Sequence, residues 1–217
     1  MKTYGEYCSI AKSLDVVGDR WTLLIVRELI LRGACRYTDL RNGLPGIASN
    51  LLADRLRDLE AAGLVAKEGA PPPIATTLFR LTSRGEELRP VLEELMRWGM
   101  PLMSEEGPAD AVRSHWIAAA LELGLSDRHP EDAPVSLELQ TGHEPIVLKP
   151  HDGTIDIELG SAEHPDAILS GPPKAILGLL LGFVDLPEAE ATGVTYQGDH
   201  GILARVVAQK APSAAPS

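Results

Sequence analysis

The sequence has little cysteine and no long apolar run. Cys8 and Cys35 are too few for a disulfide framework and fit a reducing cytoplasm. The first 20 residues are polar and charged, without the apolar core of a secretory signal. The apolar run around Ile176 to Val184 is about half of the roughly 18 residues that a membrane span needs. We therefore expect a cytoplasmic protein without a membrane partner.

The sequence also lacks the motifs of common enzymes and metal sites. It has no nucleophile elbow, no P-loop and no dinucleotide fingerprint. None of its six histidines lies four residues from another histidine or a cysteine on one helix, as in helical metal sites. We therefore expect a protein that is not an enzyme and uses no metal or other cofactor.

Positive charge is scarce overall but concentrated in one region. The net charge is −11, which by itself argues against nucleic-acid binding. Residues 1–103, however, contain 14 Lys and Arg against 13 Asp and Glu, whereas the remaining residues contain 6 against 18. Residues 20–57 contain seven Arg against three acidic residues. Because phosphate binding needs only a local positive potential, the first half remains a candidate for binding DNA.

Composition divides the chain into two domains. An apolar content of 44% is sufficient for a folded core. The predicted parts are a mainly helical domain at 1–103, a linker at 104–111, a second domain at 112–208 and a disordered tail at 209–217.

The first domain has the periodicity of helices around one hairpin. The predicted helices are Ser9–Val17, Thr22–Leu31, a short helix capped by Thr38, Ser49–Ala62, and Ser83 to about Met103. The predicted strands are Leu64–Lys67 and Leu78–Leu81. A short helix, a Pro45-Gly46 turn and an amphipathic helix form a helix-turn-helix, and the hairpin forms a wing. Pro90 either kinks the last helix or belongs to its first turn.

The helix at Ser49–Ala62 has two different faces. Its apolar face carries Leu52, Leu56 and Leu59. Its opposite, polar face carries Asn50, Ala53, Asp54 and Arg57. Arginine bonds bidentately to guanine and asparagine to adenine, whereas Asp54 can accept from cytosine N4 but also repels phosphate. This helix is therefore predicted to read DNA, and we call it the reading helix.

Residues before the reading helix suit the DNA backbone. Arg36, Arg41 and the cap at Thr38 can bind phosphates. The alternative is an ordinary amphipathic helix whose polar face is only solvated. The Pro-Gly turn, the hairpin and the local positive charge favour DNA binding.

Several short motifs follow in a specific order along the first 100 residues. They are Cys8-Ser9-Ile10, Gly18-Asp19-Arg20-Trp21-Thr22, Arg36-Tyr37-Thr38-Asp39-Leu40, Gly46-Ile47, Leu52, Arg55-Leu56-Arg57-Asp58-Leu59-Glu60, Gly63-Leu64-Val65, Arg80-Leu81-Thr82-Ser83-Arg84-Gly85 and Trp98. In these residues the chain resembles the HxlR family of winged helix-turn-helix regulators, relatives of the MarR type. The resemblance implies a homodimer joined through the first and last helices of the domain. It also implies a reading helix in the major groove, a wing near the minor groove, and repression as the commoner mode of regulation.

The chain departs from the family pattern at two places. Ala48 stands where the family usually has serine, so capping of the reading helix passes to Ser49 or is weaker. The wing loop, residues 69–77, contains no Lys or Arg. We expect either a weaker wing contact or one made through Thr76 and Thr77.

The second domain has the pattern of an α+β fold with one antiparallel sheet. The predicted helices are Val112–Leu125, Pro173–Gly182 and Pro187–Ala191. The predicted strands are Val135–Gln140, Pro145–Leu148, Thr154–Leu159, Ala167–Ser170 and Ile202–Val207.

Part of the second domain resembles the sterol-carrier-protein-like fold. The residues that carry this resemblance are Asp152-Gly153-Thr154-Ile155, Pro165-Asp166-Ala167-Ile168-Leu169-Ser170-Gly171, Leu180-Leu181-Gly182 and Gly193-Val194-Thr195-Tyr196-Gln197-Gly198-Asp199. The resemblance implies an apolar cavity and a hydrophobic small-molecule effector. The candidate lining residues are Trp116, Leu177, Leu180 and Leu181. The alternative is a packing or dimerisation module with a filled core.

The two cysteines are candidates for redox sensing. Cys8 matches a cysteine that some members of the HxlR family use in this way, and Cys35 precedes Arg36, whose charge favours a thiolate. The alternative, which we favour, is that these thiols are buried or idle.

Two other functions compete with DNA binding. One is a lipid or small-molecule carrier whose helical half serves for dimerisation, and the other is an enzyme in the second domain. A pure carrier has no reason to concentrate arginine around a helix-turn-helix. We therefore predict a homodimeric regulator that binds double-stranded DNA and responds to a hydrophobic ligand.

Overall fold

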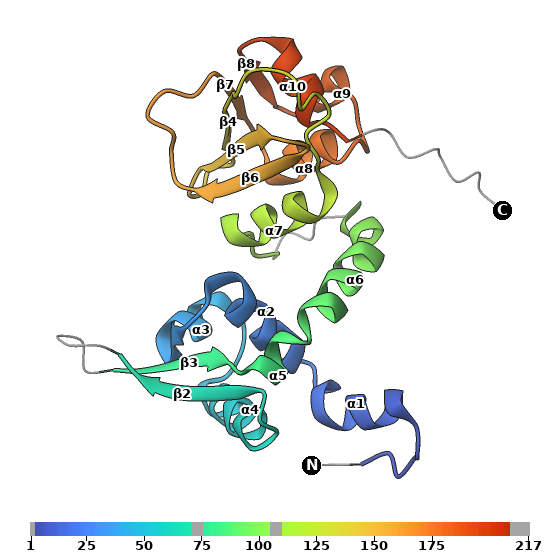
Figure 1. Ribbon diagram of the computed structural model, residues 1–217, viewed down its shortest axis with the longest axis vertical. Helices are drawn as coiled ribbons and strands as arrows, with labels where there is room; N and C mark the ends of the chain where they lie inside the picture. The colour runs from blue at the N-terminus through green and yellow to red at the C-terminus, as the bar shows by residue number, and fades with distance from the viewer. Residues whose placement is uncertain (1–2, 71–75, 105–109, 209–217) are drawn as a thin grey trace. The chain divides into compact units, whose positions relative to one another are not determined.

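The computed structural model describes residues 3–70, 76–104 and 110–208. The chain divides into two compact units, Met1–Leu102 and Met103–Ser217, and each is described by itself (Figure 1). The predicted tail and most of the predicted linker lie outside the described residues. Within the described ranges, no helix is long and apolar enough to cross a membrane.

The first unit consists of helices around a small antiparallel sheet. Its helices are α1 (Ser9–Val17), α2 (Thr22–Arg32), α3 (Tyr37–Gly43), α4 (Ser49–Ala61), α5 (Ser83–Glu86) and α6 (Arg89–Gly99), and a 3-10 helix follows at Met100–Ser104. Its strands are β1 (Cys35–Arg36), β2 (Val65–Gly69) and β3 (Thr77–Leu81), in the order β1-β3-β2. The β2–β3 hairpin extends past α4 as a wing does (Figure 1).

The core of the first unit fixes the orientation of α4, the reading helix. Leu52, Leu56 and Leu59 are at most 2% exposed and belong to the same apolar cluster as Ile25 and Leu29 of α2. Burial of a leucine side chain contributes about 1.5–3 kcal/mol, so these three leucines hold one face of α4 inward. The opposite polar face must then point outward.

The start of α3 differs from the prediction. Thr38 does not cap this helix, because α3 begins at Tyr37 and Arg36 occupies the capping position. Instead, the carboxylate of Asp39 accepts a hydrogen bond from the backbone N–H of Arg36 at 3.0 Å. Asp39 reaches back from the first turn, and a carboxylate there also interacts favourably with the helix dipole.

Two further features of the first unit were not predicted. Strand β1 pairs with β3, with Cys35 opposite Phe79, but two residues are too few to show any period. The single predicted last helix is divided into α5 and α6. Pro90 lies in the first turn of α6. Backbone N–H groups in a first turn have no partner within the helix, so the N–H that proline lacks is not needed there.

The second unit consists of a five-stranded sheet with helices. The strands are β4 (Leu137–Gln140), β5 (Ile146–His151), β6 (Thr154–Leu159), β7 (Ala167–Ser170) and β8 (Thr195–Gln197), in the order β6-β5-β4-β7-β8. The helices are α7 (Ser114–Gly124), α8 (Pro173–Leu180), α9 (Leu186–Ala191) and α10 (His200–Val206). Helices α8, α9 and α10 gather on the side of the sheet away from the link between β6 and β7 (Figure 1).

The sheet of the second unit corrects the prediction of a purely antiparallel sheet. Strands β4 and β7 pair in parallel, with Leu139 opposite Leu169. The chain leaves β6 at one edge, crosses the sheet and enters β7 beside β4. Parallel pairing follows from this crossing, which no local sequence pattern shows.

The predicted last strand, Ile202–Val207, is wrong, because this segment belongs to helix α10. Asp199 caps the helix by accepting from the backbone N–H of Gly201 at 2.8 Å. Leu203 and Val206, three residues apart, are both buried on the helix face that meets the core. Short apolar runs are ambiguous between strand and buried helix, and here the helix cap and a buried arginine favour the helix.

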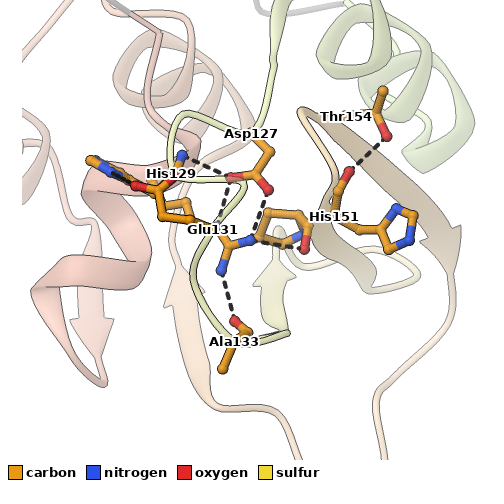
Figure 2. Close-up of polar contacts among 8 residues, drawn as sticks. Asp127, His129, Glu131, Ala133, His151 and Thr154 are labelled. Carbon is orange, nitrogen blue, oxygen red and sulfur yellow. Dashed lines mark hydrogen bonds and ion pairs between the residues drawn. The ribbon is translucent and has the colours of Figure 1, made fainter.

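That buried arginine, Arg205, is held by an ion pair inside the second unit. Its Nε and Nη2 donate to the two carboxylate oxygens of Asp127 at 2.6 and 2.7 Å. Its Nη1 donates to the backbone oxygen of Ala133 at 2.8 Å, and Figure 2 shows the polar contacts around Asp127 and Ala133. The guanidinium lowers the pKa of Asp127, and the carboxylate raises the pKa of Arg205. The pair therefore joins α10 to the segment between α7 and β4.

Candidate nucleic-acid interface

The turn before α4 depends on one glycine and one tyrosine. Gly46 has φ +85°, a conformation that disfavours side chains with a Cβ, and the N–H of Ile47 bonds back to Leu44 at 3.1 Å. The hydroxyl of Tyr37 donates to the backbone oxygen of Ser49 at 2.5 Å. These contacts fix the start of α4 relative to α3, which is the geometry that a helix-turn-helix requires.

The cap of α4 is weak. Ala48 occupies the capping position and has no side chain that can accept a hydrogen bond. Ser49 is the first residue of the helix, and only its backbone oxygen has a contact outside α4 among the described hydrogen bonds. Tyr37 thus anchors this end of the helix in place of a capping serine.

The polar face of α4 places its candidate base-reading residues together. The Arg57 side chain is 71% exposed and donates to Asp54 one turn earlier. The amide oxygen of Asn50 accepts from the N–H of Leu51 at 3.0 Å, and Ala53 lies half-buried on the same face. The side chain most suited to a base edge is therefore exposed, but it is already paired with a carboxylate.

The candidate phosphate-binding residues lie on and before α3. Arg36, Thr38 and Arg41 are all exposed. Across the described ranges, neither Arg36 nor Arg41 forms an ion pair with a carboxylate. Both guanidinium groups are therefore available to an anionic partner.

The wing lies partly outside the described residues, which stop at Ala70 and resume at Thr76. The backbone oxygen of Thr76 accepts from the N–H of Ala70 at 2.8 Å, and exposed Thr77 begins β3 opposite Gly69. Thr76 is half-buried. Both threonines thus lie at the base of the wing loop.

The wing strands carry cations that the sequence reasoning overlooked. Lys67 donates to Glu60 of α4, and Arg80 donates to Glu68 across the hairpin, each at 2.7 Å. The signal was available, since both cations lie within the predicted strands. Their acidic partners depend on the hairpin register and on how β2 packs against α4.

Arg55 was also overlooked as a residue that positions α4. Its Nη1 lies 3.2 Å from a carboxylate oxygen of Asp19 and 3.2 Å from one of Asp58. Its Nε is buried and has no hydrogen-bond partner in the described structure. Asp19 lies between α1 and α2, so Arg55 ties α4 to that loop. Arg55 lies between the two faces of the helix, which is why the periodicity did not single it out.

Apolar side chains are exposed on the first and last helices of the first unit. On α1, Ile10 is 69% and Leu14 43% exposed. On α6, Val91 and Leu95 line a shallow hollow, and Trp98 is 73% exposed. Large apolar side chains gathered in this way are typical of a protein–protein interface.

The two cysteines lie in different environments. Cys8 is exposed immediately before α1, and the backbone N–H groups of Ala11 and Ile10 lower its pKa. Cys35 is buried in β1, and burial raises its pKa. Cys8 is therefore the more accessible thiol and the one whose thiolate is favoured.

The candidate ligand residues of the second unit lie in its apolar core or at the edge of that core. Leu177 and Leu180 are buried in the core, while Trp116 and Leu181 are half-buried. A hollow of about 360 Å³ in this unit lies beside β5, β6 and the link after β6, and none of the four candidate residues lines it. Among the described residues, no cluster of His, Cys, Asp and Glu could hold a metal ion.

Comparison with known proteins identifies the class of protein. The model of the HxlR-like helix-turn-helix family matches residues 16–107. The uncharacterized HTH-type transcriptional regulator YvaP of Bacillus subtilis is 33% identical over 87 residues, which cover 40% of this chain and 80% of YvaP. The uncharacterized HTH-type regulator Rv3095 of Mycobacterium tuberculosis is 36% identical over 108 residues, covering 49% of this chain and 67% of Rv3095.

A solved structure of a MarR-family protein from Porphyromonas gingivalis W83 is also similar. It is 34% identical and matches 46% of this chain and 97% of its own, with a TM-score of 0.41. The sequence matches and the winged helix-turn-helix define a DNA-binding transcriptional regulator. The chain belongs to the HxlR-like helix-turn-helix family. The family match ends at residue 107, before the sheet of the second unit.

Proposed function

We propose that two copies of this chain bind an operator, each inserting α4 into the major groove. The observation that carries this proposal is the exposed polar face of α4, held outward by three buried leucines. The residues proposed to contact DNA are Arg36, Thr38, Arg41, Ser49, Asn50, Ala53, Asp54, Arg57, Thr76 and Thr77. As the resemblance implies, binding represses transcription from the adjacent promoter.

The proposed residues divide into base and phosphate contacts. Arg57 suits guanine and Asn50 suits adenine, and the small side chain of Ala53 allows close approach. Arg36 and Arg41 bind phosphates of the DNA backbone. Thr76 and Thr77 bring the wing to the backbone through hydroxyl groups, which contribute less than a charge does.

The exposed apolar side chains of α1 and α6 support a homodimer. Covering Ile10, Val91 and Trp98 removes apolar surface from water, which stabilises association by about 25 cal/mol per Å². Two linked reading helices bind far more tightly than one, because the second contact is intramolecular. Trp98→Glu should therefore give a monomer in analytical ultracentrifugation; an unchanged dimer would exclude this interface.

The proposed reading face is tested by Arg57→Ala on an operator selected from random duplexes. The expected loss is about 1–3 kcal/mol of specific binding, because one bidentate base contact is removed. Arg84→Ala is the matched control, since Arg84 on α5 is similarly exposed and pairs with Glu87, three residues later and just after that helix. Equal affinities of both variants and the unaltered chain would show that α4 reads with another face.

We further propose that the second unit is a sterol-carrier-like domain that senses a hydrophobic ligand. Three features support it: helices cover one face of the sheet, Pro172 and Pro173 start α8, and Leu177 and Leu180 face the interior. A ligand changes DNA affinity only if it binds the two states of the protein unequally. Thermal shifts and operator affinity across a panel of hydrophobic metabolites test this proposal, and a panel without any binder would contradict it.

A further inference from the structure

The cations near the proposed DNA-binding face are mostly paired with carboxylates. The pairs are Arg57–Asp54 on α4, Arg80–Glu68 on the hairpin and Lys67–Glu60 between α4 and β2. All six side chains are 40 to 71% exposed, so water and DNA can reach them. An exposed ion pair of this kind contributes little to folding, because water screens the two charges. The contribution of these pairs to folding stability therefore does not explain why an acidic residue lies beside each cation.

Two of these acids lie where DNA contact is expected. Asp54 shares the polar face of α4 with Arg57. Glu68 precedes Gly69, which pairs with Thr77 at the end of the β2–β3 ladder, so Glu68 lies at the base of the wing loop. Each carboxylate competes with a DNA phosphate for its cation and also repels that phosphate.

We propose that Asp54 and Glu68 are specificity-determining residues, which suppress binding to DNA that lacks the operator sequence. Nonspecific binding comes almost entirely from cations that neutralise DNA phosphates. For each neutralised phosphate, the slope of log affinity against log salt concentration is about −0.9. A cation that stays with its carboxylate adds nothing to this affinity. Arg57 leaves Asp54 only where a correctly placed base offers two acceptors in return.

This inference rests on the proposed reading face and adds a physical reason for it. A chain with few free cations near α4, chiefly Arg36 and Arg41, binds random DNA weakly. Base contacts then decide where the protein binds. The ratio of operator affinity to random-DNA affinity is consequently larger than the same fold would have without these two acids.

The test uses the full chain with Asp54→Asn, Glu68→Gln and the double variant. Fluorescence anisotropy measures affinity for a selected operator and for a random duplex between 50 and 200 mM salt. For each freed cation, we expect the slope of log affinity against log salt on random DNA to steepen by about 0.9. This corresponds to about threefold more affinity lost across that range. The operator-to-random ratio should fall severalfold. Asp and Asn have similar helix propensities, so α4 itself is not expected to change.

Glu158→Gln provides the matched control. Glu158 pairs across β5 and β6 with Lys149 at 2.7 Å, and their side chains are 59% and 44% exposed, much like those of the Glu68 pair. This variant removes the same charge from the second unit, and we expect no change in slope or ratio. The inference fails if Asp54→Asn and Glu68→Gln behave like Glu158→Gln.

Two further outcomes separate this inference from the proposed reading face. If Asp54→Asn loses operator affinity and gains none on random DNA, Asp54 acts only as the DNA contact proposed for it above, and its screening role is contradicted. If Arg57→Ala leaves operator binding intact, the reading face itself is wrong. If Arg57→Ala weakens the operator complex while Asp54→Asn matches the control, only the present inference is overturned.

Discussion

Single residues of one type behave differently according to their position, and the two cysteines show this clearly. Cys8 precedes α1, where backbone N–H groups stabilise the thiolate and lower its pKa. Cys35 is 3% exposed in β1, and burial raises its pKa. The two thiols should therefore differ in their reactivity toward electrophiles and oxidants.

We expect iodoacetamide to modify Cys8 much faster than Cys35. Because its pKa is lowered, Cys8 should also stay reactive to a lower pH than a free cysteine, whose pKa is about 8.5. Mass spectrometry of the two cysteine peptides over time and pH measures both effects. Equal rates would contradict this assignment. A response of DNA binding to oxidant that persists in Cys8→Ser would exclude Cys8 as a sensor.

The candidate site was predictable where it depends on positions within one helix. Arg57, Asp54 and Asn50 share a face of α4 because of their spacing, and a leucine face fixes that orientation. The pairing of Arg57 with Asp54 also follows from their i, i+3 spacing, although the sequence analysis considered for Asp54 only contacts with cytosine and phosphate. Arg80–Glu68 could be found only with the hairpin register.

At the scale of elements, the link between α4 and the loop before α2 decides how firmly the reading helix is held. Arg55 joins Asp19 and Asp58 with one nitrogen and leaves a buried Nε without a partner in the described structure. A bridge between two elements orders both of them. We therefore expect Arg55 to affect DNA binding by positioning α4 rather than by contacting a base.

We expect Arg55→Ala to weaken operator binding and to leave the preferred bases unchanged. Asp19→Ala should have a similar but smaller effect, because Asp58 still holds Arg55. In a double-mutant cycle the two changes should couple by about 0.2–1 kcal/mol, the range for partly exposed ion pairs. If the effects of Arg55→Ala and Asp19→Ala on operator affinity simply add, the bridge does not position α4. If Arg55→Ala changes the preferred bases, Arg55 itself contacts a base.

Elements with a strong local period were predicted well, and the others were not. Strand β6 has the predicted bounds and α4 differs by one residue, because an alternating and a helical apolar pattern define them. Strand β7 also has the predicted bounds, although its short apolar run does not alternate. Helix α10 was taken for a strand, since its apolar run suits either structure. What holds the helix is Arg205, whose partner Asp127 lies 78 residues away. The parallel β4–β7 pair likewise depends on distant segments.

At the scale of the whole molecule, the stability of the second unit depends on that buried ion pair. The side chains of Arg205 and Asp127 are 4% and 0% exposed, and removing one partner leaves a buried charge without compensation. We expect Arg205→Met to destabilise the second unit by about 3–5 kcal/mol. Glu158→Gln, which breaks an exposed pair, should cost about 1 kcal/mol or less. Native-state hydrogen exchange of β4 and β5 amides in the full chain measures the loss of stability in each variant. Equal losses in the two variants would contradict the role of burial.

The same pair predicts how stability depends on pH. The pKa of Asp127 is lower in the folded chain than in the unfolded chain, where it is about 3.9. Its contribution is therefore complete above the unfolded pKa and is lost as pH falls through the folded pKa. Asp127→Asn should remove this part of the acid dependence, and an unchanged acid profile in that variant would contradict it.

The central claim is that Arg57 on α4 reads a base in each half of a twofold operator. The most direct measurement is the base preference of the full chain and of Arg57→Ala, each determined by selection from random duplexes and sequencing. We predict a symmetric site in which the variant loses its preference at one guanine per half-site and keeps the others. An identical preference profile for both proteins would contradict the account.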